Sequence, residues 1–548
     1  MRIRATAVLA LSLSLGLSAC GGGNGPAGSA GPAAGEHKLN DLLVTTPAAK
    51  GELDKATWNL PFGEPASLDP IKAFNYPENT VVANLCEGLM RLNPDYSVTP
   101  NLAEKVESTD QKTWVYTLRE GVRFWDGKPM TVDDVLFSLR RHLDSGEGSY
   151  WASDQITGNI DSIDKTGDRE ITIRLKKPDA TLNSYMATPI GVVVERAQRE
   201  QAGGKYGTPE GAVMCTGPFK LASWEKGSKI SLERNDDYWD TQRRAKTKQL
   251  DLQFIVDPGA IASALDTGAI DGSYDVPVGA VDQLSASQNG KLYLGKSLQL
   301  VAVISTGNGA LGDPAVRRAL TLATDRKAIA QTVFAGTAQA SRSLVPNSGW
   351  TYGDDVFGPA HDALPDTDKN IEEAKKLLAG KDAGSAPITI AYPSERQFYA
   401  DILSEMSNAA RELGLTIQPK GIPSAQYGAF FSDPKARAGY DGFMTTNYMD
   451  IPDPLAFLRT IAAKGGSQNF NGYDDPKVQS LIEQAASTTD DTARAKLVAE
   501  LQTEVMEQTP WLPIAEPAVR LFLNKRVTGV PASFVYLYYP WAAGLGAA

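Results

Sequence analysis

Histidine and cysteine are scarce, because this chain of 548 residues contains only three of each. Neither residue type occurs at the spacing of a metal site. The motifs GxSxG, HExxH and the phosphate-binding GxxxxGK[ST] are absent, and the few histidines leave few candidates for a general base. The sequence therefore predicts no metal, no other cofactor and no catalysis, with a hydrolase that works through carboxylates alone as the remaining enzymatic alternative.

Runs of basic residues are also absent. The chain has 54 Lys and Arg against 65 Asp and Glu, which gives a formal net charge of −11. An acidic protein without a basic stretch is a poor candidate for nucleic-acid binding. Beyond the N-terminus, no apolar run approaches the roughly 18–20 residues that a membrane span needs. We therefore expect no nucleic-acid partner and no membrane segment after the first one.

The N-terminus has the pattern of an export signal. Arg2 and Arg4 precede a short apolar run at residues 5–17, and residues 17–20 read LSAC. This end resembles the bacterial lipobox, in which the Cys becomes the lipid-modified first residue after cleavage. The resemblance implies a signal peptide at residues 1–19 and a lipidated Cys20. The rest of the chain would then be anchored to the cell membrane by lipid, on the extracytoplasmic side.

Residues 20–52 are predicted to form the lipidated Cys and a flexible linker. Residues 21–35 read GGGNGPAGSAGPAAG, which is rich in Gly, Ala and Pro and has no periodicity. Gly23, Gly25 and Gly28 fit the dinucleotide fingerprint GxGxxG. We reject dinucleotide binding, because no strand precedes these glycines and no helix follows them.

Cys86 and Cys215 could form a disulfide, because exported chains fold under oxidising conditions. Cys86 lies in a helical pattern at residues 82–92, and Cys215 lies in a turn that leads into a strand. The alternative is that both are small, buried, apolar side chains. The sequence leaves this choice open.

Strand and helix signals alternate through the first half of the chain. Residues 55–60, 114–118 and 170–175 have the composition and alternation of strands. Thr131 is typical of a helix N-cap, because acidic residues follow it in the first turn. This half is therefore expected to combine strands with helices.

The second half has a more regular alternation. Residues 368–378 and 401–413 read as helices, and residues 388–390 and 415–417 read as strands. Residues 301–304, VAVI, form a continuous apolar strand, as buried parallel strands do. We expect a parallel α/β lobe here.

The most informative stretch is residues 440–457, YDGFMTTNYMDIPDPLAF. Its first part reads as a strand, and Pro452 favours a turn because it keeps the residue before it out of the helical region. Asp453 and Pro454 suit the N-cap and the first position of a helix. Asp450 thus lies between a strand end and a helix, where ligands bind in open α/β sheets. The plainer alternative is a solvated carboxylate in a loop.

An ordered series of short motifs resembles the family 5 extracellular solute-binding proteins, the peptide/nickel-binding receptors of ABC importers. The series covers nearly the whole chain after the signal. The motifs are SLDP (67–70), EGL (87–89), PNLAE (100–104), LREGV (118–122), DG (126–127), DDV (133–135), TGPF (216–219), RN (234–235), YW (238–239), Asp313, VRRAL (316–320), DR (325–326), Asp450 with DP (453–454), NF (469–470), Tyr473 and PWLPI (510–514). One such motif is weak evidence, whereas the ordered set is specific.

The resemblance implies the α/β, two-lobed fold of periplasmic binding proteins, of type II, in its large three-subdomain form. Lobe 1 would comprise residues 53–300 and 514–548, with residues 82–188 as the extra subdomain. Lobe 2 would comprise residues 301–513. The chain would cross twice between the lobes, so we expect a hinged central cleft that closes around a ligand.

The resemblance also implies which residues bind the ligand. In peptide-binding members, an Asp after a second-lobe strand binds the α-ammonium group of the ligand, and Asp450 matches it. Arg396 is the candidate for the ligand carboxylate, although its position is shifted along the chain. Asn447 and Tyr448 stand where the family often has Gly-Trp, so the family's side-chain preference does not carry over. Trp350 is a further candidate for the cleft wall.

The implied function is an extracytoplasmic lipoprotein that captures dipeptides or oligopeptides between its lobes and delivers them to an ABC transporter permease. We expect a monomer that contacts the membrane through its lipid only. Two alternatives stay open. The same fold could bind a metal chelate, haem, an opine or an oligosaccharide, or the chain could be an exported enzyme or a signalling receptor.

Overall fold

The computed structural model describes residues 39–548, apart from 154, 367, 382–383 and 385. The predicted signal peptide, Cys20 and the first part of the predicted linker lie outside these residues. In the described ranges, no helix is long and apolar enough to span a membrane. No group of three or more His, Cys, Asp or Glu side chains in the same ranges could hold a metal ion.

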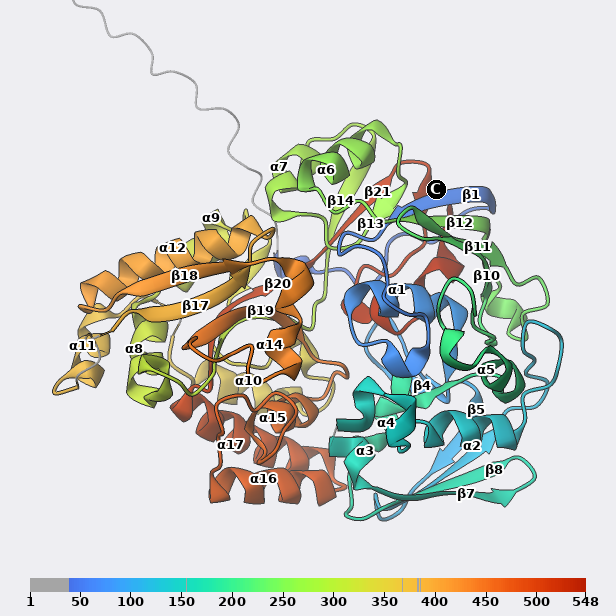
Figure 1. The fold of residues 1–548 in the computed structure, drawn as a ribbon, viewed down its shortest axis with the longest axis horizontal. Helices are drawn as coiled ribbons and strands as arrows, with labels where there is room; N and C mark the ends of the chain where they lie inside the picture. The colour runs from blue at the N-terminus through green and yellow to red at the C-terminus, as the bar shows by residue number, and fades with distance from the viewer. Residues whose placement is uncertain (1–38, 154, 367, 382–383, 385) are drawn as a thin grey trace, which may run out of the picture. The chain divides into compact units, whose positions relative to one another are not determined.

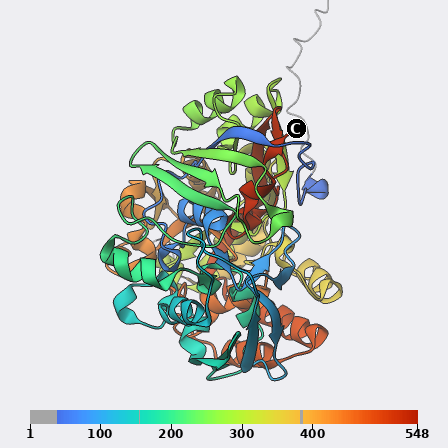
Figure 2. The ribbon, with the colours of Figure 1, turned by 90° about the vertical axis from the view of Figure 1, so that its right-hand side faces the viewer.

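Strands from both ends of the chain build a seven-stranded sheet in the order β10-β11-β12-β1-β13-β21-β14. The N-terminal β1 (blue) is parallel to β12 and β13, and β21 (red) pairs with β13 and β14 (Figures 1 and 2). The strand predicted at residues 55–60 is confirmed as β1. The bounds are β1 Leu53–Asn59, β10 Phe219–Glu225, β11 Lys229–Arg234, β12 Thr247–Gln253, β13 Gly272–Ser273, β14 Gly290–Gly295 and β21 Val519–Asn524.

The structure also contains smaller sheets, and the largest of them lies in the range predicted as the extra subdomain. One is a four-stranded antiparallel sheet in the order β5-β6-β8-β7, and it confirms the strands predicted at 114–118 and 170–175. The bounds are β5 Ala103–Glu107, β6 Thr113–Leu118, β7 Ile160–Gly167 and β8 Glu170–Leu175. The two-stranded sheets pair β2 Glu87–Gly88 with β9 Val192–Val193, β3 Met90–Leu92 with β4 Val98–Pro100, and β22 Val527–Thr528 with β23 Gly546–Ala547.

The helix after Thr131 begins as predicted. Thr131 Oγ1 accepts a hydrogen bond from the Asp134 backbone N–H at 3.3 Å, and the Asp134 carboxylate accepts one from the Thr131 N–H at 3.0 Å. This reciprocal pair is a capping box. The helices of this half are α1 Tyr76–Leu85, α2 Val132–Arg140, α3 Gln155–Asn159, α4 Leu182–Tyr185, α5 Arg196–Ala202, α6 Pro258–Thr267 and α7 Val281–Ser285.

The helical pattern at residues 82–92 is wrong in its second half. α1 ends at Leu85, Cys86 is extended, and β2 and β3 follow. The reason is close backbone packing, because a Cβ on Gly88 would lie 2.6 Å from the Met186 carbonyl oxygen. Glu87 and Gly88 instead pair with β9. Tertiary pairing thus overrides the local helical pattern.

A six-stranded mixed sheet, in the order β16-β20-β15-β19-β17-β18, forms the other large layer (Figure 1). β17 is parallel to both β18 and β19, and α12 connects β17 to β18. The alternation predicted for residues 368–417 is therefore confirmed. The bounds are β15 Gln299–Ser305, β16 Ala338–Ala340, β17 Ile388–Pro393, β18 Ile417–Ile422, β19 Gly442–Tyr448 and β20 Trp511–Pro517.

The apolar strand β15 is antiparallel to both of its neighbours, β19 and β20, and the expectation of a parallel strand here is wrong. Its residues are nevertheless all buried. Val301 and Val303 pack in one core cluster, and Ala302 and Ile304 pack in another. The continuous apolar run therefore reports burial of both faces and not strand direction.

Helices cover this second sheet and extend below it in Figure 1. Small residues let α8, α11 and α12 pack closely, with Ala319 and Ala323 against Ala374 and Ala409. The helices of this half are α8 Pro314–Ala323, α9 Arg326–Thr332, α10 Asp354–Asp362, α11 Ile371–Leu378, α12 Gln397–Glu412, α13 Ser424–Tyr427, α14 Ala429–Ser432, α15 Pro454–Ala462, α16 Pro476–Ser487 and α17 Asp491–Gln508.

The chain passes between the two large sheets twice. The first passage lies between β14 and β15, and the second lies between β20 and β21. The predicted boundaries at 300/301 and 513/514 fall inside β15 and β20. The second passage comes late because Glu516 and Pro517 still pair with β16.

Candidate functional site

The turn around Asp450 has the predicted local structure. β19 ends at Tyr448, and α15 begins at Pro454. Asp453 is the N-cap, and its carboxylate accepts a hydrogen bond from the Leu455 N–H at 2.9 Å. Asp450 therefore follows a strand end that belongs to the six-stranded sheet.

The carboxylate of Asp450 is half-buried and contacts the C-terminal part of the chain. The Tyr538 hydroxyl donates to Asp450 Oδ1 at 2.7 Å. Loss of solvent around the phenol, together with the charge of Asp450, raises the pKa of Tyr538 well above its usual value. Tyr538 thus keeps its proton and holds one carboxylate oxygen in place.

Asp450 lies in the wall of a cavity of about 260 Å³. Of the lining residues that the structure describes, seven are aromatic, Asp450 is the only acidic one, and Arg396 is the only basic one. The lining consists of Phe74, Asn75, Tyr76, Tyr150, Pro393, Arg396, Tyr399, Ser424, Tyr427, Gly428, Phe431, Met444, Thr445, Thr446, Asn447, Tyr448, Asp450 and Gln468. Four of the five predicted ligand residues therefore meet in one cavity.

Tyr448 and Asn447 form part of the cavity wall as well. The Tyr448 hydroxyl donates to the Phe74 carbonyl at 2.8 Å, which joins β19 to the loop before α1. Burial, and after it the charge of Asp450, raises the pKa of Tyr448. The Asn447 side chain donates to Gln468 Oε1 and accepts from the Tyr448 N–H, both at 2.7 Å. Both residues shape the wall through bonds within the protein.

Arg396 precedes α12 and is half-buried. Its guanidinium carbon lies 4.8 Å from the ring centre of Phe62, a distance suited to a cation–π contact. Among the acidic groups that the structure describes, none lies within 4.0 Å of it to form a salt bridge. Burial raises the pKa of the Asp275 carboxylate and the Arg396 charge acts against this rise, but the two side chains form no salt bridge. A guanidinium without a salt-bridge partner in a cavity wall is suited to a ligand carboxylate.

Trp350 is not among the residues that line the cavity. It stacks on Phe357 with ring centres 6.1 Å apart and meets His361 edge-on at 5.3 Å, both in α10. The sequence missed other lining residues, chiefly the aromatic ones. Phe74 and Tyr150 come from parts of the chain 376 and 300 residues before Asp450, and no local pattern marks them.

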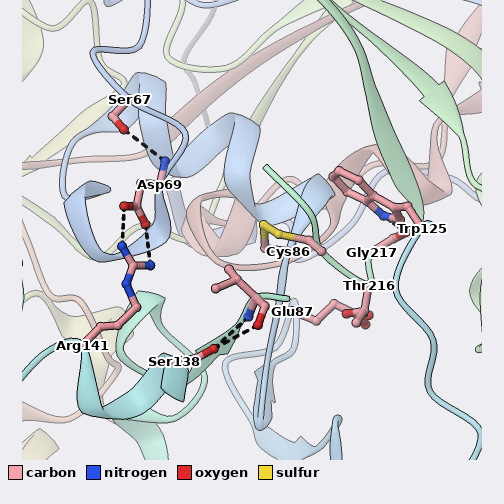
Figure 3. Close-up of a disulfide and its surroundings, with 11 residues drawn as sticks. Ser67, Asp69, Cys86, Glu87, Trp125, Ser138, Arg141, Thr216 and Gly217 are labelled. Atoms are coloured by element: carbon pink, nitrogen blue, oxygen red, sulfur yellow. Dashed lines mark hydrogen bonds and ion pairs between the residues drawn. A yellow bond between two sulfur atoms is a disulfide. The ribbon is translucent and has the colours of Figure 1, made fainter. Parts of the chain in front are cut away.

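A buried ion pair holds the loop that carries Phe74. Asp69, of the SLDP motif, accepts two hydrogen bonds from the Arg141 guanidinium, at 3.0 and 2.7 Å (Figure 3). Both side chains are almost completely buried. Arg141 also pairs with Glu147 at 2.9 Å. The family motif therefore has a structural role next to the cavity.

A disulfide joins Cys86 to Cys215, with 4.9 Å between the two Cα atoms (Figure 3). It links the end of α1 to the segment before β10. Beside it, Glu87 accepts hydrogen bonds from Tyr238, Trp239 and Thr216 at 2.7–2.8 Å. Burial raises the pKa of Glu87, against the effect of these donors. The structure thus resolves the choice that the sequence left open.

His142 should make the protein acid-sensitive. Its side chain is buried, and its Nδ1 is 2.8 Å from Ser149 Oγ. Burial, and then the charge of Arg141, lowers the pKa of His142 to about 3. The unfolded chain takes up a proton below about pH 6.5, and the folded chain does not. This group alone should therefore remove about 1.4 kcal/mol of stability for each pH unit below 6.5, down to about pH 3.

Urea unfolding of wild type and His142→Gln between pH 7 and 5 measures this effect. As the pH falls, the free energy of unfolding should decrease more steeply for the wild type than for the variant. The difference between the two slopes should correspond to the uptake of about one proton. His361, whose pKa is also lowered by burial, stays in both proteins. Equal slopes in the two proteins would rule out the role of His142.

Comparison with known proteins gives consistent matches. The profile described as "Bacterial extracellular solute-binding proteins, family 5 Middle" matches residues 97–469. The oligopeptide-binding protein OppA of Bacillus subtilis is 26% identical over 543 residues, with 92% of each chain covered. The dipeptide-binding protein of Escherichia coli K12 is 28% identical over 472 residues, covering 79% of this chain and 83% of its own.

A solved structure shows the same fold. The periplasmic binding protein DppA of Helicobacter pylori, in complex with the peptide STSA, superposes with a TM-score of 0.79 at 21% identity. The match covers 91% of this chain and 99% of that one. It spans both large sheets described above.

Proposed function

The chain belongs to the bacterial extracellular solute-binding proteins of family 5 and has their two-lobed α/β fold, and from this premise we propose that it captures short peptides for an ABC importer. The observation that carries the proposal is the charge distribution in the cavity. One carboxylate, Asp450, and one guanidinium, Arg396, stand in a wall whose other described residues are neutral. A free peptide is a zwitterion, so each of its charged ends would meet an opposite charge.

The cavity volume supports a small ligand. Its 260 Å³ lies near the lower end of the roughly 300–1,000 Å³ typical of small-molecule sites. This size favours dipeptides and tripeptides over long oligopeptides. Thr445, Thr446 and Ser424 add small polar side chains to the same wall, although the hydroxyls of Thr446 and Ser424 already bond to Tyr399 and Glu395.

The names of the relatives support the same ligand class. The protein from B. subtilis is named for oligopeptide binding and the one from E. coli for dipeptide binding. Our proposal includes delivery of the bound peptide to a membrane permease. It also includes a lipid anchor at Cys20 and a monomeric, non-catalytic receptor.

A free-amine peptide should raise the melting temperature without being consumed. Binding to the folded state alone stabilises it by about 2.7 kcal/mol when the ligand is at 100 times its dissociation constant. We expect a pool of dipeptides and tripeptides to raise the melting temperature by several degrees. Chromatography of the pool after incubation should recover every peptide intact.

Free amino acids and an oligosaccharide mixture serve as controls for this experiment. A shift with the oligosaccharide and none with peptides would reject the peptide ligand. Hydrolysis of the peptides by the purified protein would reject the receptor role and favour an enzyme.

A further inference from the structure

Phe74 and Tyr150 form an exposed aromatic pair in the cavity wall. Among the large hydrophobic side chains in the described part of the chain, they are the only aromatic ones that are exposed, at 44% and 47%. Their rings stack with centres 4.1 Å apart and planes 13° from parallel. Exposed rings of this size are unusual unless something covers them.

The pair is held rigidly from behind. The buried indole of Trp151 donates to the carbonyl of Ala73 at 3.0 Å and so ties the two loops together. Ser149 Oγ accepts from the Trp151 N–H at 3.2 Å and donates to the Ile71 carbonyl at 3.4 Å. The Trp151 ring also meets Tyr150 edge-on at 5.6 Å. The aromatic pair is therefore preorganised, which lowers the entropic cost of binding.

The opposite wall contains further tyrosine rings, and their hydroxyls form hydrogen bonds within the protein. Tyr427 donates to the Met444 carbonyl at 2.7 Å, and the hydroxyls of Tyr399 and Thr446 lie 2.7 Å apart. The protein thus uses these hydroxyls itself, and the rings remain as apolar surface. Among the described residues of the cavity lining, Asp450 is the single carboxylate, so a cationic side chain of the ligand would find no second one among them.

We propose that Phe74 and Tyr150 form a specificity site for an aromatic side chain of the bound peptide. The inference rests on the proposed function, in which Asp450 and Arg396 hold the two ends of the peptide. Aromatic rings bind one another in offset-stacked or edge-to-face arrangements, and a pre-formed pair offers such a surface. The aromatic pair therefore selects peptides that carry an aromatic side chain, while Asp450 and Arg396 bind the charged ends.

Calorimetry on the purified chain tests this selectivity. The ligands are trialanine, Ala-Lys-Ala and three tripeptides of Ala that carry one Phe in the first, second or third position. At least one Phe peptide should bind about tenfold more tightly than trialanine. Tyr150→Ala should reduce this preference to within about twofold, and Tyr150→Phe should keep it, because the ring and not the hydroxyl contacts the ligand.

Phe74→Ala provides a second variant with the same expectation, and Leu143→Ala is the matched control. Leu143 is also 44% exposed but lies outside the cavity lining, so its variant should keep the preference. Three results would each overturn the inference and leave the peptide function standing. The wild type could bind all tripeptides equally, it could bind Ala-Lys-Ala most tightly, or Tyr150→Ala could weaken trialanine and the Phe peptides equally. Absence of binding by every tripeptide would overturn both.

Discussion

Asp450→Asn is expected to weaken binding of a free-amine peptide by roughly 30-fold or more, because loss of one partner from a desolvated charge pair costs about 2–5 kcal/mol. Among the described residues that line the cavity, Asp450 is the only acidic one, so none of the others can replace its charge. Asparagine keeps the shape and can still accept the Tyr538 hydrogen bond. The measurement is calorimetry with a peptide that binds the wild type.

The control for this experiment is Asp368→Asn. Asp368 pairs with Lys327 and is 65% exposed, so this variant removes a surface charge of the same sign. Its affinity should stay within about twofold of the wild type, because exposed pairs contribute little. Tyr538→Phe should give an intermediate loss, since it removes one hydrogen bond of about 1 kcal/mol and leaves the charge. Unchanged affinity in Asp450→Asn would remove this residue from the site.

Asp179→Ala should weaken ligand binding although Asp179 lies outside the cavity. Its carboxylate pairs with Arg459 of α15, and both side chains are at most 5% exposed. The Ala180 N–H also donates to the Ala486 carbonyl of α16, at 2.9 Å. These contacts join a segment before the first passage between the sheets to helices after it. A hinge motion about the two passages, which would separate the lobes, would break both contacts.

Asp179→Ala removes the carboxylate partner of Arg459, while Arg459 keeps its hydrogen bond to Thr181 and its charge stays buried in the closed arrangement. Breaking a buried pair in this way costs about 3–5 kcal/mol, and opening relieves the cost by hydrating the guanidinium. Part of the binding free energy of the ligand is then used to close the protein. The affinity of the ligand should therefore fall by at least about tenfold. Calorimetry measures the affinity, and solution scattering of the ligand-free variant should show a larger radius of gyration.

Lys177→Ala is the matched control at the same contact. Lys177 pairs with Glu483 of α16, but these side chains are 73% and 64% exposed. Removal of an exposed pair should change affinity by less than about threefold. If Asp179→Ala bound peptide like the wild type while both variants folded normally, the buried pair would have no part in closure.

Local chemistry made several elements predictable. The N-caps Thr131 and Asp453, and the prolines and glycines around them, act within one helical turn, so short windows of sequence contain their signals. β15 shows the limit. Its apolar run reports burial, but the partners β19 and β20 lie about 140 and 210 residues away, and only they determine its antiparallel pairing.

Only part of the candidate cavity was predictable, namely Arg396 and the segment of Asn447, Tyr448 and Asp450. Asp450 follows a strand and precedes a capped helix, so local signals and family motifs both lead to it. Phe74 and Tyr150 have no such context, because their exposure and stacking arise from contacts between distant loops. Tyr538 is likewise joined to Asp450 across 88 residues. Trp350 was a plausible wall residue by type, yet packing on Phe357 places it outside the cavity lining.

The pairing of Asp450 with a ligand ammonium is the central claim, and one calorimetric cycle tests it most directly. Wild type and Asp450→Asn are each titrated with the same tripeptide in its free and N-acetylated forms. Acetylation should cost the wild type roughly 30-fold or more in affinity and cost the variant almost nothing, because the same interaction is removed twice. An equal loss on acetylation in both proteins would contradict the account, since the amine would then be recognised by another group.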